Sequence, residues 1–525
     1  MKLELSKLKG VCPDQLAPFE GLWEYTKNLD HYPGTIFRFP LRLGTTESKL
    51  KKSKLELDGN VIRRLMDAYF CEARISLLFL RRIRSIDFTI YGKHNLGWSI
   101  SRQTPLDEDM KSFSESVVCS FTKNGDQDTK VAGNDNWWVA IEDLQPEAEQ
   151  LPYSPRRLIK NIECGIAALV SSKLSSHSTG KVLREILPPR MFSILPLPIL
   201  SDLPIYIHAT FSLSGDRRSL IVDEHGEESH GSSWNRYLLG TALPKLYISF
   251  LEDIGARVPR DVINFWPQST PPKRSCSETI CSSFWMELPK SSRRLFPKAQ
   301  PSSNLGRRQA PELFDIKKAM FDFLPEDQST ILAPLLLSLE LPLVRHVPKS
   351  IADNLKAFAK VKCITGSVLR ELCKKEPNRL LLQKAVSKNP EVLEVLLKLA
   401  IPAGDDQSDL DGCHFLPLNN GTLGTLKLLK PHIVSTEYYM ASTEEIKLFE
   451  FASTLLISTE TGKTFEKALE SRKFNIQKLR LCHVKNLLME RVEPKTVSAK
   501  TIYGSLSSGN IGIRVLIHLP LGRVF

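Results

Sequence analysis

Residues 460–464, ETGKT, carry the Gly-Lys-Thr end of a phosphate-binding loop. Such a loop also needs a glycine five residues before Gly462, because only then can successive backbone N–H groups curl around a phosphate. Position 457 is isoleucine. We therefore predict that this segment begins a helix and binds no nucleotide.

Other residues have the types found in metal sites but not the spacing. His225 and His230 lie five apart and each is followed by a glycine, whereas the helix of a zinc protease needs histidines four apart. Cys276 and Cys281 are not spaced as in a zinc knuckle and have no histidine nearby. The aspartates between 405 and 411 lack the alternating order of calcium ligands. No G-x-S-x-G sequence or triad pattern occurs, so we predict no metal, no cofactor and no catalytic residue.

Hydrophobic spacing predicts the elements that surround these residues in the first half of the chain. Ser154-Pro155 is typical of a helix start, and we expect that helix to reach about residue 173. A turn is expected at Ser214-Gly215-Asp216 and a kink at Pro244. The other predictions are a helix over 60–85, strands over 86–91, 98–100, 136–141 and 205–213, extended chain from 195, and a helix over 233–254.

The second half of the chain is predicted to be mainly helical. Asn419-Asn420-Gly421 indicates a type I′-like hairpin turn, and Ser442 with Glu445 forms a capping-box pattern that begins a helix. A strand is expected near 511–520. The predicted helices are 312–324, 328–340, 349–361, 366–374, 377–387, 390–400 and about 463–490.

Net charge is +12, and half of this excess falls in residues 267–311, where eight Lys or Arg face two Glu. We interpret this Pro/Ser-rich stretch as a solvated basic linker. The alternative is a nucleic-acid site in which Phe284, Trp285 and Phe296 stack on bases. Ten scattered cysteines, no hydrophobic leader and no apolar tract of membrane length predict a cytoplasmic or nuclear protein with reduced thiols and no membrane contact.

Several blocks resemble one family, the sacsin repeats. DQLAPFEGLW with YPGTIFRFPLR looks like the end of the family's ATPase module, and LPLPILSDLPIYIHATFSLSGDRRSLIVD resembles a strand that leads to a double arginine. WNRYLLGTALPKLYISFLEDI is similar to the helix that follows, and FLPLNNGTLGTL to the family's strand hairpin. The blocks keep the family order over about residues 12–430, and the last ninety residues match no family.

The resemblance implies a GHKL-class ATPase module, the class of gyrase and the ninety-kilodalton heat-shock chaperones. Gly34-Thr35 matches the late strand of that class, whose Thr lies beside an adenine-binding Asp. The Asp-x-Gly-x-Gly element and the glycine-rich lid are absent from this sequence, and Glu24 and Asn28 lie too close to Thr35 to be the first motif. Thr35 is therefore expected to be a vestigial nucleotide-site position, in a trimmed descendant or in a chain that begins downstream of the true start.

By the same resemblance, Arg217 and Arg218 match the middle-segment arginine that reaches the γ-phosphate in the chaperones. The alternative is that they pair with Asp216, Asp223 or Glu224 and hold a turn. The predicted fold is α+β: a remnant of a GHKL-type sheet, a middle-domain-like α/β region, then a mainly helical region with a hairpin. The expected divisions are 1–48, 49–265, 266–311, 312–430 and 431–525.

We expect a chaperone-related protein that binds client or chaperone proteins and has no ATPase activity of its own. Two alternatives stay open at this stage. One is a partial ATPase completed in trans by a separate GHKL chain, with Arg217 or Arg218 contributing. The other is nucleic-acid binding through residues 267–311.

Overall fold

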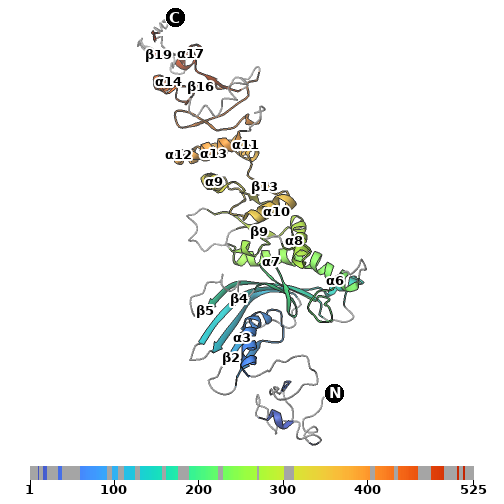
Figure 1. The fold of residues 1–525 in the computed structure, drawn as a ribbon. Helices are drawn as coiled ribbons and strands as arrows, with labels where there is room; N and C mark the ends of the chain where they lie inside the picture. Colours follow the sequence, from blue (N-terminus) through green and yellow to red (C-terminus); the bar gives the residue numbers. More distant parts are fainter. Residues whose placement is uncertain are drawn as a thin grey trace. The chain divides into compact units, whose positions relative to one another are not determined.

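A computed structural model gives the structure of the chain (Figure 1). It describes residues 10, 16–20, 34–37, 39, 59–90, 97–103, 112–124, 130–155, 161–174, 188–222, 229–259, 261–268, 271–300, 312–401, 408–430, 435–458, 474–489, 505–507 and 512–514. The chain divides into two compact units. Unit 1 comprises residues 1–106, 118–135 and 171–187, and unit 2 comprises 107–117, 136–170 and 188–525.

The fold is α+β, and its largest sheet has eight strands in the order β1-β2-β3-β4-β5-β8-β6-β7. β1 and β2 pair antiparallel, with Phe88 opposite Trp98, whereas β6 and β8 run parallel. The strands are β1 Ser85–Thr89, β2 Gly97–Arg102, β3 Phe113–Asn124, β4 Lys130–Asp143, β5 Glu163–Leu174, β6 Arg190–Ser193, β7 Leu195–Leu200 and β8 Tyr206–Ala209. The predictions at 86–91, 98–100, 136–141 and 205–213 are thus confirmed as β1, β2, β4 and β8.

In unit 1, helix α3 (Gly59–Ser76) packs its apolar face on the sheet. Phe70 lies edge-on to Phe121 and close to Trp98, and all three side chains are buried. At the buried end of α3, the Arg74 guanidinium donates to both carboxylate oxygens of Asp135 at 2.6–2.9 Å. This pair fixes α3 to β4 in a place where an unpaired charge would be very costly.

The core of unit 2 contains a helical segment that changes its pitch. Helix α6 (His230–Tyr237) passes through a π-helical turn, η2 (Leu238–Ala242), into α7 (Leu243–Arg257). Pro244 lacks an N–H and its ring crowds the preceding turn, so a widened turn at this point has a physical cause. The predicted helix with an irregularity near Pro244 is confirmed.

The segment expected to be a basic linker is folded over residues 271–300. It contains α8 (Cys276–Glu287), the turn η4 (Leu288–Lys290) and strand β9 (Arg294–Pro297). Phe284, Trp285 and Phe296 are at most 2% exposed and pack together around Trp266. The basic residues lie on the outside of a packed element, and the aromatic residues are not accessible for stacking on bases.

Unit 2 also contains two three-stranded parallel sheets with the same topology. In each sheet the first strand in sequence is central, giving the orders β12-β11-β13 and β17-β16-β18. The first sheet comprises β11 (Met320–Phe321), β12 (Leu343–Val344) and β13 (Lys362–Cys363), connected by α9 (Glu326–Ser338) and α10 (Lys349–Ala359). The second comprises β16 (Tyr438–Ala441), β17 (Leu456–Ser458) and β18 (Ile476–Lys478).

Between these sheets lie three helices and a short hairpin. The helices are α11 (Gly366–Lys374), α12 (Glu376–Lys388) and α13 (Glu391–Ala400), as predicted. β14 (Leu416–Pro417) and β15 (Leu423–Gly424) form the predicted hairpin. Only Gly421 of its turn has positive φ, 80°, so the turn is not type I′, which needs positive φ at both central residues.

The remaining elements are short. The capping box of Ser442 and Glu445 is present as predicted, although its helix has only six residues. The elements are η1 (Ala17–Phe19), α4 (Gln145–Gln150), η3 (Val262–Phe265), β10 (Leu313–Asp315), η6 (Ser408–Leu410), α14 (Thr443–Leu448), η7 (Glu450–Ala452), α17 (Leu481–Met489), β19 (Ser505–Ser507) and β20 (Gly512–Arg514).

Several predictions from the sequence are wrong. The helix expected after Ser154-Pro155 is not formed over 163–173, because that run of Ile, Ala, Leu and Val is the buried strand β5. Residues 312–324 form β10 and β11 instead of a helix, and β18 interrupts the helix expected over 463–490. The long strand β3 was not predicted, because its Ser and Thr residues weaken the alternation of apolar and polar residues that indicates a strand.

The strand expected at the start of the chain is not formed by its described residues. Positions 34–37 and 39 carry no strand assignment, and Phe37 and Phe39 are 71% and 81% exposed. We expected Ile36 and Phe39 to pack this strand against the helix from Asn60; Phe39 is exposed and Ile36 is half-buried. None of the helices in the described parts of the chain is long and apolar enough to cross a bilayer.

Candidate functional site

The two arginines singled out in the sequence lie in a tight loop after β8, here called the arginine loop (Ser212–Ile221). Leu213 and Leu220 form an antiparallel bridge across its base. The Ser214 N–H donates to the Ser219 carbonyl and the Ile221 N–H to the Ser212 carbonyl, at 2.9 and 3.0 Å. The loop is therefore a small hairpin, with Arg217 and Arg218 exposed at its tip.

Asn235 of α6 holds the two arms of this loop together from below. Its Oδ1 accepts from the Ser212 N–H at 2.9 Å, and its Nδ2 donates to the carbonyls of Ser212 and Ile221 at 2.7 and 2.9 Å. The side chain is only 3% exposed. A single buried amide thus satisfies backbone groups on both arms, which makes the arginine loop rigid at its base.

Asp216 stabilises the tip through local hydrogen bonds. Its Oδ1 accepts from the Ser214 hydroxyl at 2.7 Å and from the Arg218 N–H at 3.1 Å. The Ser214 hydroxyl and then the Arg218 N–H lower the pKa of Asp216 below its ordinary value of 3.8. The carboxylate is therefore engaged in shaping the turn, and the charge of Arg218 adds only a smaller attraction.

Arg217 links the arginine loop to the hairpin between β6 and β7. Its φ is 58°, in the left-handed region, and its Nη2 donates to the Ser193 carbonyl at 3.4 Å. The next residue, Ile194, also has positive φ, 68°, which is an unusual conformation for a β-branched side chain. The Arg217 side chain thus contacts the residue that precedes Ile194, so a hydrogen bond connects the two segments that contain these left-handed residues. Such strain often marks a functional position.

A buried histidine supports the strained isoleucine. The Ile194 N–H donates to Nδ1 of His208 at 3.3 Å, and Nε2 of His208 lies 3.3 Å from Oε1 of Glu163. Because Nδ1 accepts, the neutral tautomer with a proton on Nε2 fits both contacts. The His208 side chain is fully buried, so the tip of the β6–β7 hairpin is held firmly.

The arginine loop presents positive charge at the surface. Arg217 and Arg218 offer two exposed cations on a rigid base, a geometry suited to an anion. No group of three or more His, Cys, Asp or Glu side chains in the described parts of the chain could hold a metal ion. Cys276 and Cys281 lie on α8 within the protein core, which accounts for them structurally.

The other sequence-predicted positions are Thr35 in unit 1 and residues that the structure does not describe. Thr35 is exposed, and the described residues beside it, 34, 36, 37 and 39, form no strand. Asp223, Glu224 and His225, like Glu24, Asn28 and residues 460–464, lie outside the described residues. Asn235 was missed, because one Asn inside a helical pattern gives no sequence signal of its contacts.

The comparisons with known proteins agree with the resemblance seen in the sequence. The Sacsin domain family matches residues 2–99. Human Sacsin is 24% identical over 307 residues, an alignment that covers 51% of this chain and 6% of the human protein. The chain is sacsin-like. This sacsin-like chain spans only a small fraction of its relative, and no solved structure matches it.

Proposed function

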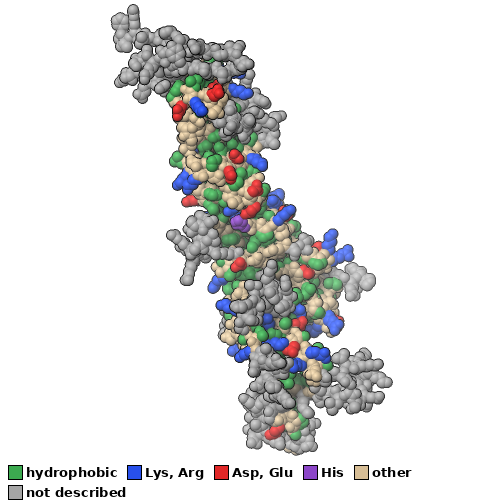
Figure 2. Space-filling model, turned by 60° about the vertical axis from the view of Figure 1, so that its left-hand side comes forward, with side chains coloured by type: hydrophobic (Ala, Val, Ile, Leu, Met, Phe, Trp, Pro, Cys, Tyr) green, Lys and Arg blue, Asp and Glu red, His purple; other side chains and the backbone are tan. Residues whose placement is uncertain are grey.

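We propose that this sacsin-like chain is a chaperone-related protein that binds client or chaperone proteins and does not hydrolyse ATP by itself. The observation that carries the proposal is the partly exposed apolar segment Ile194–Leu200, which forms the turn and the second strand of the β6–β7 hairpin. Ile194, Leu195 and Leu200 are 48–55% exposed, and every residue from 194 to 200 is apolar. Figure 2 shows one face of the molecule, on which hydrophobic side chains are exposed between charged ones.

The conformation of Ile194 supports a binding role for this hairpin. A β-branched residue with φ of 68° costs stability that glycine would not cost at this position. His208 and Arg217 nevertheless hold the residue in place, with its side chain in solvent. The fold thus holds an apolar side chain at the surface although its backbone conformation is unfavourable. Exposed apolar side chains of this sort commonly contact a binding partner.

The strand β7 favours contact through side chains and not strand addition. β7 lies at an edge of the eight-stranded sheet and contains Pro196 and Pro198. Proline has no N–H to offer a further strand, and natural edge strands use it to prevent such pairing. A client would therefore contact the exposed leucines and isoleucine of this hairpin.

The test is a substitution that separates stability from binding. Ile194→Gly should raise the melting temperature, because it relieves the left-handed strain, and should weaken the suppression of aggregation of a denatured client, measured by light scattering. Lys360→Gly is the matched control. Lys360 also has a positive φ, 45°, but it lies at the end of α10 and not in the β6–β7 hairpin. If Ile194→Gly suppresses aggregation as well as wild type does, the hairpin is not the client site.

A partial ATPase completed in trans is a second candidate, favoured by the rigid presentation of Arg217 and Arg218. In that case each arginine would stabilise the charge that develops on a phosphate bound by a separate GHKL chain. Arg217→Ala or Arg218→Ala should then slow hydrolysis in a reconstituted mixture. Arg293→Ala is the control, because Arg293 is a surface arginine paired with Glu252 at 2.7 Å. An unchanged rate in both test variants would remove this candidate.

A further inference from the structure

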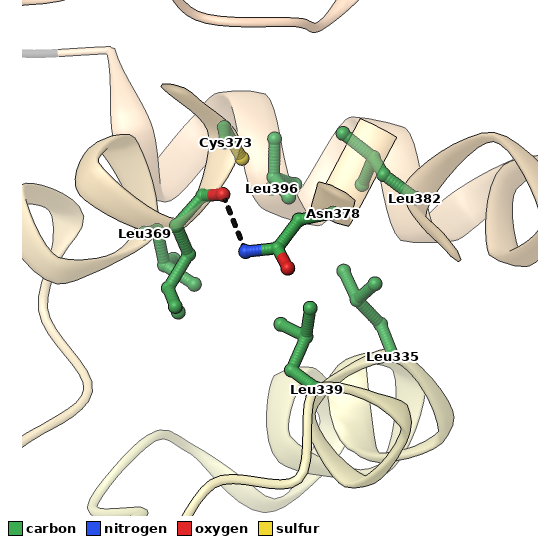
Figure 3. A pocket seen from close by; sticks show the side chains of 8 residues that line it. Leu335, Leu339, Leu369, Cys373, Asn378, Leu382 and Leu396 are labelled. Carbon is green, nitrogen blue, oxygen red and sulfur yellow. Dashed lines mark hydrogen bonds between the residues drawn. The ribbon is translucent and has the colours of Figure 1, made fainter. Parts of the chain in front are cut away.

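A client segment needs an accessible surface, and the apolar hollow between α9, α11, α12 and α13 does not provide one (Figure 3). Most of the side chains that line it are buried leucines of the core. Asn378 donates from Nδ2 to the Leu372 carbonyl at 2.9 Å beside this hollow. The free space is about 10 Å³, room for about one water molecule and too little for a side chain. Contact with a polypeptide must therefore occur at the surface.

The strand β1 forms one edge of the eight-stranded sheet. The Arg102 N–H donates to the Arg84 carbonyl at 2.8 Å, so these two opposite residues are a hydrogen-bonded pair. Along antiparallel strands such pairs alternate with pairs that are not hydrogen-bonded. Every second residue after Arg84 therefore bonds to β2, and the others point their N–H and carbonyl groups away from the sheet, without a backbone partner among the described residues. These outward residues are Ser85, Asp87 and Thr89.

The two edges of this sheet differ in how they can receive a further strand. At one edge, β7 contains Pro196 and Pro198, which have no N–H to donate. At the other edge, β1 has the sequence SIDFT, with neither proline nor lysine, the residues that natural edge strands use to prevent pairing. Its Ile, Phe and Thr residues are typical of strands. The β1 edge is therefore the one that can accept a strand from another polypeptide.

The two faces of β1 determine which side chains an added strand should carry. On the α3 face, Ile86 and Phe88 are only half-buried at the margin of the apolar cluster around Trp98. On the opposite face, Asp87 is the one charged side chain among nine residues in register on β1, β2 and β3. The nine are Ser85, Asp87, Thr89, Gly97, Ser99, Ser101, Ser120, Thr122 and Asn124. An added strand should thus place apolar side chains beside Ile86 and Phe88 and a basic one opposite Asp87.

The other charges near β1 restrict the partner further. Arg82 and Arg84 are exposed just before the strand, so a run of basic residues in the partner would be repelled. On the α3 face, Asp67 already pairs with Lys123 at 2.9 Å and with Arg63 at 3.9 Å. One basic residue, opposite Asp87, is what this surface favours.

A second copy of this chain does not fit the β1 edge. The outward backbone groups are centred on Asp87, so two antiparallel β1 strands would place one Asp87 directly opposite the other. Like charges in that position are destabilising. The partner is therefore a different polypeptide segment.

We propose that the β1 edge binds an extended segment of a client protein as an added strand. The segment alternates apolar with hydroxyl side chains and carries one Lys or Arg opposite Asp87. The proposal rests on the protein-binding function given above, because it states the form in which a client binds, and it uses the edge of the sheet away from β7. Main-chain hydrogen bonds supply most of the affinity in this mode, and the alternating side chains supply the selectivity.

The test measures the binding of a labelled peptide by fluorescence anisotropy. The peptide has four valines separated by threonine, lysine and threonine, and its matched control has the same residues in an order that does not alternate. Asp87→Pro removes an outward N–H and should weaken binding about tenfold, whereas Asp87→Ala keeps that N–H and should weaken it only about threefold. Proline is tolerated where an edge N–H faces solvent, so the fold should be retained.

A charge exchange at the same position does not depend on proline. Asp87 is exposed, so Asp87→Lys should fold as the wild type does. It should bind the lysine peptide weakly and should recover binding when glutamate replaces the lysine of the peptide. Loss of binding to both peptides would contradict the assignment of the basic residue opposite Asp87.

The outcomes separate this inference from the proposed function. Equal binding of the alternating and control peptides, or equal binding by Asp87→Pro and Asp87→Ala, would overturn strand addition at β1. A wild-type dimer that Asp87→Pro converts to a monomer would assign the edge to a second copy and overturn it as well. Peptide binding without suppression of client aggregation would keep the strand site and remove the proposed function. Suppression without peptide binding would remove the strand site alone.

Discussion

Replacing Asn235 with alanine removes the three hydrogen bonds that hold the arginine loop. Each hydrogen bond of this kind contributes about 1 kcal/mol net, and a donor or acceptor left without a partner costs more than that. The three bonds of 2.7–2.9 Å to Ser212 and Ile221 therefore give an expected loss of about 3 kcal/mol in the local free energy of unfolding. The loop should open far more often, with Arg217 and Arg218 no longer held in one place.

Hydrogen exchange is the assay, because the Ser212 amide donates directly to Asn235 and reports the opening of the loop. In Asn235→Ala this amide should exchange on the order of a hundredfold faster. Asn354→Ala is the control, since its Nδ2 makes one part-buried bond to Ser350, and we expect its effect to stay within about 1 kcal/mol. Unchanged exchange of Ser212 in Asn235→Ala would refute the view that this amide holds the loop.

Three further predictions concern the rest of the fold. Asp135→Ala leaves the Arg74 charge buried and unpaired, so we expect the free energy of unfolding, measured by urea titration, to fall by about 4 kcal/mol. The double variant Arg74→Met with Asp135→Leu removes both charges and should restore most of that free energy. A double variant as unstable as Asp135→Ala would contradict this account. Burial lowers the pKa of His414 despite the nearby Glu376 carboxylate, so the unfolded chain binds the proton more readily than the folded chain does. The free energy of unfolding should therefore fall as the pH drops below about 6.5, and His414→Gln should lack this fall. Alkylation of the native protein, mapped by mass spectrometry, should modify exposed Cys482 well before Cys164, whose thiol pKa is raised by burial.

The sequence predicts elements with strong periodicity or clear caps. The helices that became α10, α11 and α13 are amphipathic, and the Ser442–Glu445 box is a local pattern that needs no tertiary context. β5 was mistaken for a helix because a buried strand and a buried helix both appear as continuous apolar runs. The stretch that contains α8 was interpreted as a linker from its charge and its Pro and Ser content, and no pattern within the stretch shows that Phe284, Trp285 and Phe296 pack around Trp266.

The candidate site could be predicted only in part. The turn at Ser214–Asp216 and the two arginines were visible in the sequence, whereas the clamp by Asn235 depends on residues distant in sequence. The left-handed conformations of Ile194 and Arg217 are also invisible in the sequence, because residues of this type rarely adopt them.

The most direct test of the central proposal is light scattering from a chemically denatured client diluted into the purified chain, with and without ATP. The account predicts that the chain slows aggregation to the same extent in both samples and releases no phosphate. Aggregation that proceeds as in a buffer control, or suppression that appears only while the purified chain hydrolyses ATP, would contradict it.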